Sequence, residues 1–370
     1  MQIRNRIRLL RGLWSREYAY TAPVSVTIDV TRRCNLRCSG YPSHSPHLDT
    51  PLPVLSGTGD FDVDMFGKLC GELKPMGTEN MIFSGDSEPL LHPRLLDLIG
   101  LARGAGLRTV LLTNGTLFAP EKVRSLIDSG LNLVRVSLWA TTPEEYEKNY
   151  PGTNPRFLQS ALSGLSLLAS TRAARDGASL RVTLLTVLNR INCRAVDSFV
   201  SIAIQARAGG MLFAQMRTLN GRLAGLALSR EEEAAVIGDL RRAGERLRSA
   251  GLNHNIEETI RRFEIGEAVR AKIPCYIAWL HPCINVDGAV LPCGPCAQPV
   301  GSLREQSFRE IWNGAGYREF RRRLSDPAEA AYIDQHCDCT FCCHVPTNEN
   351  VHRYYRWLSP LAAFSGMWQR

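Results

Sequence analysis

Hydrophobic and polar positions alternate along this chain with two different periods. Short runs of period two predict strands, and longer runs with apolar residues three or four apart predict helices. The predicted strands are residues 24–30, 81–85, 108–113, 133–139, 179–188 and 210–216. The predicted helices are residues 64–76, 92–105, 120–129, 156–175 and 195–207. Because strands and helices take turns, the pattern predicts six β/α units in a parallel α/β barrel or a doubly wound sheet.

Polar and glycine-rich segments follow four of the predicted strands. They are residues 31–41, residues 85–89, Asn114 with Gly115, and Ser137. Ligands of parallel α/β folds gather at the carboxyl ends of the strands, where these segments would meet. Any one of them could be an ordinary turn, but four at one rim favour a binding site.

The chain changes character after the last predicted strand. A charged helical stretch, residues 229–251, leads away from the β/α units, and from Pro274 onward the composition turns to cysteine, proline and glycine. Such changes mark domain boundaries. We expect five segments, which are an amphipathic N-terminal helix at 1–22, a barrel at 23–218, a helical connector at 219–270, a cysteine-rich domain at 271–345 and a tail at 346–370.

The bulk composition is that of a soluble globular protein. Of 370 residues, 44% are hydrophobic and 22% are charged, and no apolar run approaches the ~20 residues that span a bilayer. The first residues lack the apolar core and cleavage site of a secretory signal, so we expect a cytoplasmic protein. Thiols stay reduced there, and eight of the twelve cysteines lie between Cys275 and Cys343. Their grouping predicts metal or iron–sulfur ligation instead of disulfides.

Positive charge is concentrated at the N-terminus. The net charge is +8, and five arginines lie within the first 16 residues. Apolar residues recur between them at helical spacing. Residues 1–17 therefore predict an amphipathic helix that either rests on an anionic membrane surface or packs on its own domain. Aromatic and basic residues are not interleaved as in nucleic-acid binders, so we expect no nucleic-acid partner.

The segment TRRCNLRC, residues 31–38, follows the first predicted strand and resembles the start of the radical S-adenosylmethionine (radical SAM) family. In that family three cysteines spaced C-x3-C-x2-C bind a 4Fe-4S cluster, and the fourth iron stays open for S-adenosylmethionine. Cys34 and Cys38 match this spacing, whereas Tyr41 stands at the third position. The resemblance implies a partial (β/α)6 TIM-like barrel that carries a radical SAM cluster.

Three explanations of Tyr41 stay open. A phenolate is a hard, high-pKa ligand that suits iron–sulfur clusters poorly, so His44 or His47 would supply a third ligand in its place. Alternatively, the cluster assembles on two cysteines and loses iron easily. In the third explanation the barrel has given up cleavage of S-adenosylmethionine and survives as a scaffold.

The resemblance extends to the expected cofactor contacts. SGDSEP, residues 84–89, stands at the place of the family's glycine-glycine-glutamate-proline motif, whose backbone receives the methionine ammonium. The resemblance also implies that Ser137 bonds the ribose or carboxylate and that Leu188 flanks the adenine. The residues assigned to S-adenosylmethionine are Gly85, Asp86, Ser87, Glu88, Pro89, Ser137 and Leu188.

The cysteine-rich region resembles the SPASM/twitch extension of the same family. Cys275, Gly288 and Cys293 match its opening spacing C-x12-G-x4-C, and GSLREQSFREIWN resembles the helix that follows. A closing C-x2-C then implies an auxiliary 4Fe-4S cluster on Cys275, Cys293, Cys339 and Cys342. Four cysteines in two pairs also suit a structural zinc, so that alternative stays open. Cys70 and Cys193 are expected to be buried apolar residues.

The resemblance implies a radical SAM enzyme of the oxidoreductase type. It would abstract a hydrogen from its substrate and take electrons from a donor such as flavodoxin or ferredoxin. The segment before the barrel is short, which favours a small polar or sugar-like substrate. Two alternatives stay open, which are a catalytically degenerate iron–sulfur or zinc scaffold, because of Tyr41, and a peptide-modifying maturase.

Overall fold

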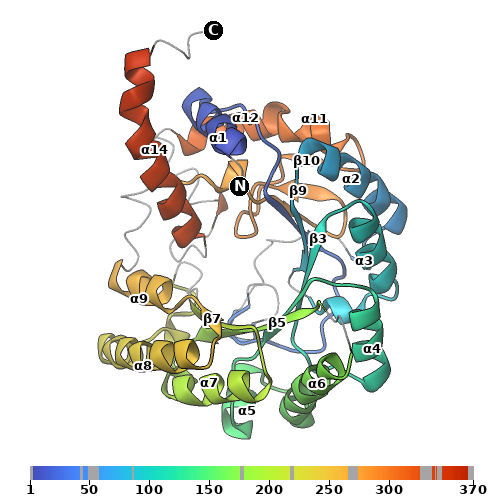
Figure 1. Cartoon of the computed structure of the whole chain (residues 1–370), viewed down its shortest axis with the longest axis vertical. Helices are drawn as coiled ribbons and strands as arrows, with labels where there is room; N and C mark the ends of the chain where they lie inside the picture. The colour runs from blue at the N-terminus through green and yellow to red at the C-terminus, as the bar shows by residue number, and fades with distance from the viewer. Residues whose placement is uncertain are drawn as a thin grey trace.

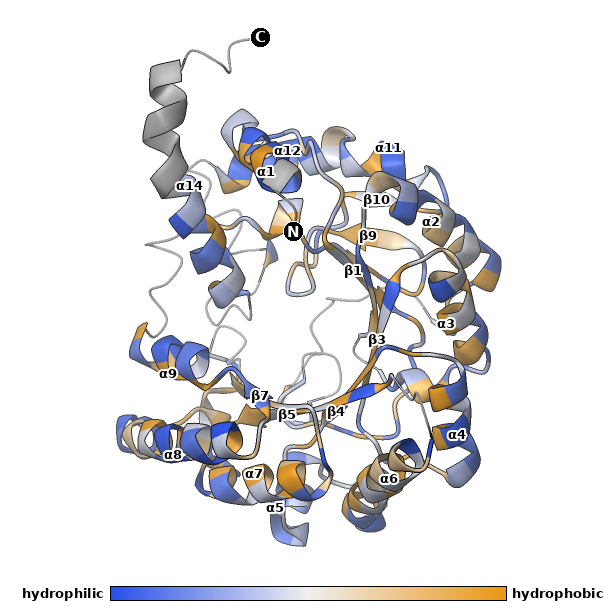
Figure 2. Cartoon of the chain, in the orientation of Figure 1, coloured by the Kyte–Doolittle hydropathy of each residue, from blue (hydrophilic) through white to orange (hydrophobic). Residues whose placement is uncertain are grey.

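The computed structural model describes ten stretches of the chain. They are residues 3–41, 45–48, 58–85, 87–175, 179–216, 221–265, 274–325, 336–337, 339 and 344–365. A curved sheet lies inside a ring of helices (Figure 1). The hydrophobic stretches of these helices face the sheet, and the hydrophilic stretches face outward (Figure 2). This is the partial α/β barrel that the sequence predicts.

The sheet contains ten strands in the order β10-β9-β8-β1-β2-β3-β4-β5-β6-β7. The six predicted strands are confirmed as β1 Ser25–Asp29, β2 Asn80–Ser84, β3 Arg108–Thr113, β4 Leu133–Ser137, β5 Arg181–Leu188 and β6 Gly210–Gln215. Four short strands extend them, namely β7 Asn253–His254, β8 Cys283–Ile284, β9 Ala289–Leu291 and β10 Gly301–Ser302. Neighbours from β1 to β7 run parallel, and β8, β9 and β10 form an antiparallel meander.

The sheet crosses two of the expected domain boundaries. β7 lies in the expected connector and pairs with β6, and β8 lies in the cysteine-rich region and pairs in parallel with β1. Both edges of the barrel sheet are therefore continued by later parts of the chain. This continuity fastens the cysteine-rich region to the first strand of the barrel.

Twelve α-helices are described, and several of them begin at a residue whose side chain caps the first turn. Their bounds are α1 Ile3–Ser15, α2 Val63–Met76, α3 Leu95–Gly104, α4 Pro120–Asp128, α5 Pro143–Asn149, α6 Arg156–Ala173, α7 Val196–Gln205, α8 Arg230–Ser249, α9 Ile256–Ile265, α11 Phe308–Trp312, α12 Ala315–Leu324 and α14 Val345–Ser365. Asp62 caps the first turn of α2, and Gly77 ends that helix with a φ of 110°. Capping boxes start α8 at Ser229 and α11 at Ser307. Pro143 opens α5, a helix that the hydrophobic pattern missed because it is only seven residues long.

Alternating burial along the strands separates a helix-facing side from a lumen-facing side. In β3, β4 and β5 every second residue is fully buried, and the residues between are half-buried or exposed. The fully buried set, which includes Leu111, Val134 and Leu184, packs under the helices. The other set faces the barrel lumen, because its members Leu112 and Ser137 line a cavity there.

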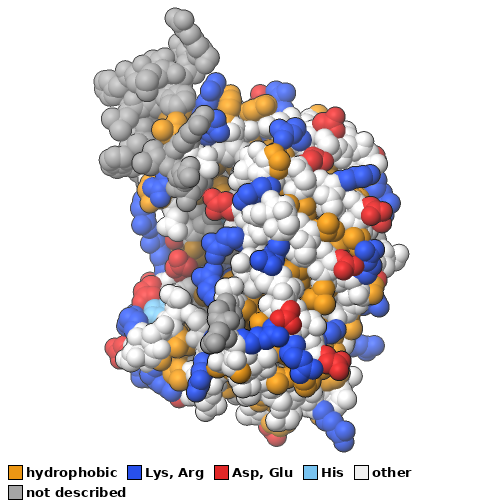
Figure 3. Space-filling model, turned by 45° about the vertical axis from the view of Figure 1, so that its right-hand side comes forward, with side chains coloured by type: hydrophobic (Ala, Val, Ile, Leu, Met, Phe, Trp, Pro, Cys, Tyr) orange, Lys and Arg blue, Asp and Glu red, His pale blue; other side chains and the backbone are white. Residues whose placement is uncertain are grey.

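The N-terminal helix α1 packs on its own chain. Leu9, Leu10 and Leu13 are buried, and Gly12 leaves little room beside Trp279. Ile7 is 49% exposed. Of the two expectations for this amphipathic helix, the structure therefore shows the one in which its apolar face packs on its own domain. Within the described ranges no helix is long and apolar enough to cross a membrane. Basic and acidic side chains are interspersed over the face in Figure 3.

A buried arginine joins the N-terminal segment to the C-terminal region. Arg321 on α12 is fully buried, and burial lowers the pKa of its guanidinium to about 9. It donates to the carbonyls of Ala278, Trp312 and Glu17 at 3.0, 2.8 and 3.3 Å. Its guanidinium carbon also lies 4.5 Å from the ring centroids of Trp312 and Tyr317. One side chain thus satisfies carbonyls from three separate segments.

Replacing this arginine should destabilise the fold. Arg321→Met would leave two buried carbonyls and the partly buried carbonyl of Glu17 without their donor, so we expect the free energy of unfolding to fall by about 3 kcal/mol. Chemical denaturation measures this change. Arg309→Met on the exposed face of α11 is the matched control and should stay within about 0.5 kcal/mol of wild type. Equal stability of the two variants would contradict the role assigned to Arg321.

Candidate cofactor site

A cavity of about 70 Å³ lies at the carboxyl ends of β1 to β4. Its lining contains six of the residues proposed from the sequence, namely Cys34, Cys38, Gly85, Ser87, Glu88 and Ser137. Tyr41, Trp139, Tyr150 and Asn114 also line it. The four polar segments after the predicted strands therefore meet at one rim, as the topology of a parallel sheet requires.

The loop that carries the two cysteines is fastened at both ends. At its start, Arg32 pairs with the buried Asp29 at 2.9 Å, and Arg33 pairs with Asp60 at 2.9 Å. At its end, the backbone N–H and the hydroxyl of Ser39 donate to carbonyls at the end of α5, those of Asn149 and Lys148, each at 2.8 Å. These contacts fix the loop between β1 and α5.

Tyr41 is held by contacts on two sides. Its hydroxyl donates to the carbonyl oxygen of Gly85 at 3.1 Å, and its ring stacks on Trp139 with centroids 6.4 Å apart. The phenol at the third ligand position therefore connects the cysteine loop to the loop after β2. Of the two candidate replacement ligands, His44 lies outside the described residues and His47 is exposed.

Gly85 adopts a conformation that only glycine accepts here. Its φ is 130°, and a side chain at this position would collide with the carboxylate of Asp29. The hydroxyl of Ser87 donates to the same carboxylate at 3.0 Å. The loop after β2 therefore folds directly over the end of β1. Asp86, between these two residues, lies outside the described part of the chain.

Glu88 is buried and ties the loop after β2 to the end of β3. Its carboxylate accepts from the Thr113 hydroxyl at 2.7 Å and from the backbone N–H groups of Asn114 and Leu90 at 2.7 and 3.0 Å. Burial raises the pKa of this carboxyl group, and the three donated hydrogen bonds oppose that rise. Pro89 follows at the first position of the short 3-10 helix Pro89–Leu91. Glu88 thus acts as a structural carboxylate, which leaves ligand contacts to the backbone of its loop.

Leu188 lies on the other side of the sheet from the cavity. It occupies a fully buried position of β5 and packs in the hydrophobic core. The lumen-facing positions of that strand are Leu185 and Val187, in the alternate register. Leu188, the residue named for adenine contact, is therefore not brought to the cavity.

Aromatic residues beside the cysteines were missed by the sequence analysis. Trp139 lines the cavity, and its buried Nε1–H makes no hydrogen bond within the described part of the chain. Burial, together with the nearby Cys38 and Cys34, raises the pKa values of Tyr146 and Tyr150. The signal available in the sequence was the position of Trp139, two residues after Ser137 at a strand end.

The side chains around this cavity supply two of the three thiol ligands that a radical SAM cluster has in this family. Cys34 and Cys38 supply two thiols, and Trp139 supplies an N–H without a protein partner, beside a largely apolar wall. Sulfur atoms of such clusters accept hydrogen bonds of this kind. Tyr41 at the third position engages Gly85. The residues thus fit a cluster that has one protein thiolate fewer than the family pattern.

The cysteines of the C-terminal region are only partly described. Cys275, Cys293 and Cys339 are each half-buried, and Cys342 lies outside the described residues. No three metal-binding side chains converge among the residues that are described. The proposed quartet therefore stays a prediction. Cys70 and Cys193 are buried as expected, and burial raises the pKa of the Cys70 thiol to about 12.

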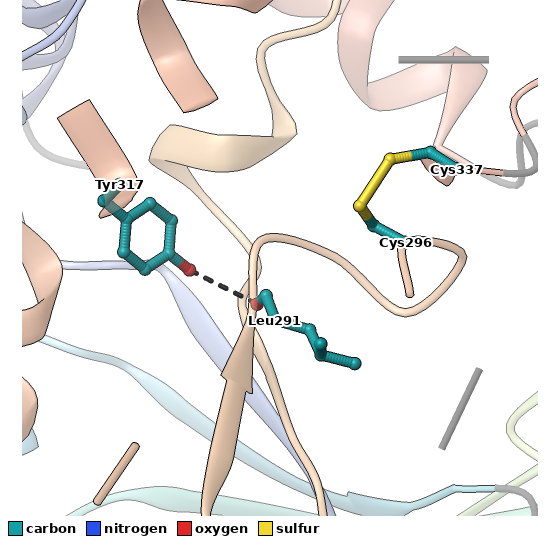
Figure 4. Close-up of a disulfide and its surroundings, with 4 residues drawn as sticks. All are labelled: Leu291, Cys296, Tyr317 and Cys337. Carbon is teal, nitrogen blue, oxygen red and sulfur yellow. Dashed lines mark hydrogen bonds between the residues drawn. A yellow bond between two sulfur atoms is a disulfide. The ribbon is translucent and has the colours of Figure 1, made fainter. Parts of the chain in front are cut away.

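One pair of cysteines departs from the expectation of reduced thiols. Cys296 and Cys337 form a disulfide, and their backbones meet in an antiparallel bridge (Figure 4). Tyr317 lies nearby and donates to the carbonyl of Leu291 at the end of β9, at 3.3 Å. The sequence analysis missed this pair because 41 residues separate its members.

Two protein-family models match the chain. The first is described as the radical SAM superfamily and matches residues 28–163, and the second, SPASM, is described as an iron-sulfur cluster-binding domain and matches residues 275–343. Among curated proteins, a PqqA peptide cyclase of Xanthomonas campestris is 27% identical over 309 residues, which cover 81% of this chain and 76% of the relative. A PqqA peptide cyclase of Ruegeria pomeroyi is 25% identical, with 82% and 78% covered.

Solved structures share the fold. SuiB of Streptococcus suis, bound to the precursor peptide SuiA, superposes with a TM-score of 0.62 at 16% identity, covering 88% of this chain and 73% of SuiB. The structure of anSMEcpe with bound AdoMet gives a TM-score of 0.61 at 13% identity, covering 91% of this chain and all of that one. Both family matches fall on the two regions that the cysteine spacing had singled out. The chain belongs to the radical SAM superfamily and carries a C-terminal SPASM iron–sulfur domain.

Proposed function

We propose that this chain is a radical SAM enzyme that modifies a peptide. The observation that carries the proposal is the cavity in which Cys34, Cys38, Gly85 and Ser137 meet. The resemblance to PqqA peptide cyclases over 81% of the chain supports a peptide substrate. It favours the peptide alternative over the small polar or sugar-like substrate that the short N-terminal segment suggested.

Cys34 and Cys38 would hold the radical SAM cluster, and the rim residues would hold S-adenosylmethionine. The cluster and S-adenosylmethionine together supply one-electron chemistry that removes a hydrogen atom from a substrate carbon. The backbone around Gly85 and Ser87 would receive the methionine end, and Ser137 would bond the ribose or carboxylate. Asp86, for which we retain the same expectation, belongs to this loop.

The remaining residues of the cavity act by orientation and by excluding water. Trp139 and Tyr150 provide an apolar wall close to the two thiols. Asn114 donates to the side chain of Asn35 in the cysteine loop at 2.9 Å, and Asn35 donates to Thr116 at 2.8 Å. These bonds hold the cysteine loop against the end of β3. A rigid, largely dry site is what controlled radical chemistry requires.

The C-terminal domain would hold the auxiliary 4Fe-4S cluster through Cys275, Cys293, Cys339 and Cys342. Four thiolates leave no open coordination position, which suits electron transfer better than substrate ligation. A cytoplasmic electron donor of the flavodoxin or ferredoxin type would supply the reducing electron. Zinc at the same four cysteines is the alternative occupant.

A second candidate function is an iron–sulfur scaffold without catalysis. The contact between Tyr41 and Gly85 favours it, because a phenol stands where the family places a third thiolate and engages the carbonyl of the loop assigned to the cofactor. The cavity of about 70 Å³ is also much smaller than the ~300 Å³ or more of typical small-molecule sites. Binding of S-adenosylmethionine would thus require this contact to open.

Iron analysis tests the proposed enzyme against the scaffold. Anaerobically reconstituted wild type should contain about four irons more than Cys34→Ala/Cys38→Ala, and S-adenosylmethionine should perturb its electron paramagnetic resonance spectrum. The double variant, which keeps the C-terminal cysteines, is the control for iron bound elsewhere. Equal iron contents and a spectrum that S-adenosylmethionine leaves unchanged would contradict the enzyme proposal.

Tyr41→Cys should strengthen cluster binding at the first site. A third thiolate would replace the contact to Gly85, so the variant should retain more iron than wild type after gel filtration under a chelator. Tyr41→Phe removes only the hydroxyl, and it should gain no iron. Both are measured as iron per chain against time. The idea fails if wild type and Tyr41→Cys lose iron at the same rate.

Glu88→Gln should loosen the rim. The amide group places a donor where the carboxylate accepts from Thr113, Asn114 or Leu90, so we expect the free energy of unfolding to fall by about 1–3 kcal/mol. The backbone amide hydrogen of Asn114, which donates to Glu88, should exchange faster with solvent. Glu121→Gln on the exposed start of α4 serves as the matched control. Unchanged exchange at Asn114 in Glu88→Gln would rule out the structural role assigned to Glu88.

A further inference from the structure

The six barrel strands β1 to β6 contain four charged residues, and three of them are arginines. The exception, Asp29, pairs with Arg32 at 2.9 Å. The arginines are Arg108 at the start of β3, Arg135 in the middle of β4 and Arg181 at the start of β5. The strands therefore bring an excess of positive charge into the barrel.

All three arginines lie on the lumen-facing side of the sheet. Arg108 shares a face with Leu112, and Arg135 shares one with Ser137, both of which line the cavity. Arg181 stands in register beside Leu133, which is two residues before Arg135 on the same face. Lumen-facing positions of neighbouring strands thus form one basic strip across β3, β4 and β5.

Arg135 is the member of this strip whose Nε is buried, whereas Arg108 and Arg181 are exposed. Its Nε is buried and makes no hydrogen bond, and within the described residues no carboxylate pairs with its guanidinium. Its register neighbours are Leu112 on β3 and Thr183 on β5, neither of which carries charge. Burial lowers the pKa of Arg135, and no charged neighbour contributes to that shift.

A cation that buries a donor nitrogen without a partner destabilises a fold unless a ligand pairs with it. A guanidinium presents a planar fork of donors that matches a carboxylate. Arg108 and Arg181 are exposed at the opposite end of the strands, where their charge would draw an anion toward the lumen. The guanidinium of Arg135 therefore favours an anionic ligand that offers two oxygen acceptors in one plane, as a carboxylate does.

We propose that Arg135 binds a carboxylate of the peptide substrate inside the barrel, one pleat below the cofactor cavity. This inference rests on the proposed function. Arg135 precedes Ser137 by two residues, which is about 7 Å along a strand. Of the residues assigned to S-adenosylmethionine, Gly85, Ser87, Glu88 and Ser137 line the cavity at the rim, and Leu188 lies in the core on the other side of the sheet. A side chain one pleat deeper is placed to hold a group that enters beneath the cofactor.

A stability measurement separates a ligand role from a structural one. Arg135→Met keeps an unbranched apolar stem and removes the unpaired charge. Its melting temperature should equal or exceed that of wild type, because no hydrogen bond or ion pair of the side chain is lost. A clear fall in melting temperature would show that the guanidinium supports the fold, and it would overturn the proposal.

Binding of a small carboxylate tests the site directly. The probes are N-acetyl-L-glutamate amide and its uncharged counterpart N-acetyl-L-glutamine amide, titrated calorimetrically into the full reconstituted chain. Wild type should bind the glutamate probe more tightly, and Arg135→Met should weaken that binding at least about tenfold. Arg135→Lys should retain part of it. Arg124→Met on the outer face of α4 is the matched control and should bind as wild type does.

Absence of preference for the glutamate probe in wild type, or equal binding by Arg135→Met, would overturn the proposal. The carboxylate of S-adenosylmethionine is the other source of the same chemistry. Arg135→Met should leave the affinities for S-adenosylmethionine and its decarboxylated analogue unchanged. Loss of affinity for S-adenosylmethionine alone would assign Arg135 to the cofactor and refute a substrate role. These titrations measure binding and do not depend on turnover. An inactive protein that still prefers the glutamate probe would contradict the proposed function and leave the carboxylate site at Arg135 intact.

Discussion

The candidate site depends on the close approach of two loops at Asp29. This buried carboxylate at the end of β1 pairs with Arg32 and accepts a hydrogen bond from Ser87, and it leaves no space for a side chain at Gly85. One residue thereby sets the positions of the cysteine loop and of the loop after β2. Glu88 and Asn114 extend the same network to the end of β3. The geometry of the cavity follows from these buried polar contacts.

The cysteine-rich region belongs to the same continuous sheet. β8 adds to the outer side of β1, so the strand that precedes the cysteine loop is held between β2 and the C-terminal region. Arg321 fastens α12 to the N-terminal segment and to the turn that contains Ala278. A chain with this topology couples the position of the auxiliary domain to the first strand of the barrel. The distance between two redox sites would thereby be fixed by the backbone.

The hydrophobic pattern predicted the six strands because alternation is strong where one face packs under helices. It could not place Leu188, since a one-residue error in register moves a side chain to the other face of the sheet. The strand-end motifs identified Cys34, Gly85 and Ser137 because a parallel sheet collects such residues at one rim. Arg135 escaped notice, because a lone arginine within a strand carries no motif and only its lack of partners reveals it. The disulfide was missed because contacts between distant segments leave no local pattern.

The central claim is that two cysteines, a tyrosine and the β2 loop form a working radical SAM site. Formation of 5′-deoxyadenosine from S-adenosylmethionine tests it most directly, with reconstituted wild type and dithionite as the reductant, and with Cys34→Ala/Cys38→Ala as the reference. The account predicts product in excess of the double variant. Identical background levels in the two proteins would contradict it and leave the scaffold as the remaining function.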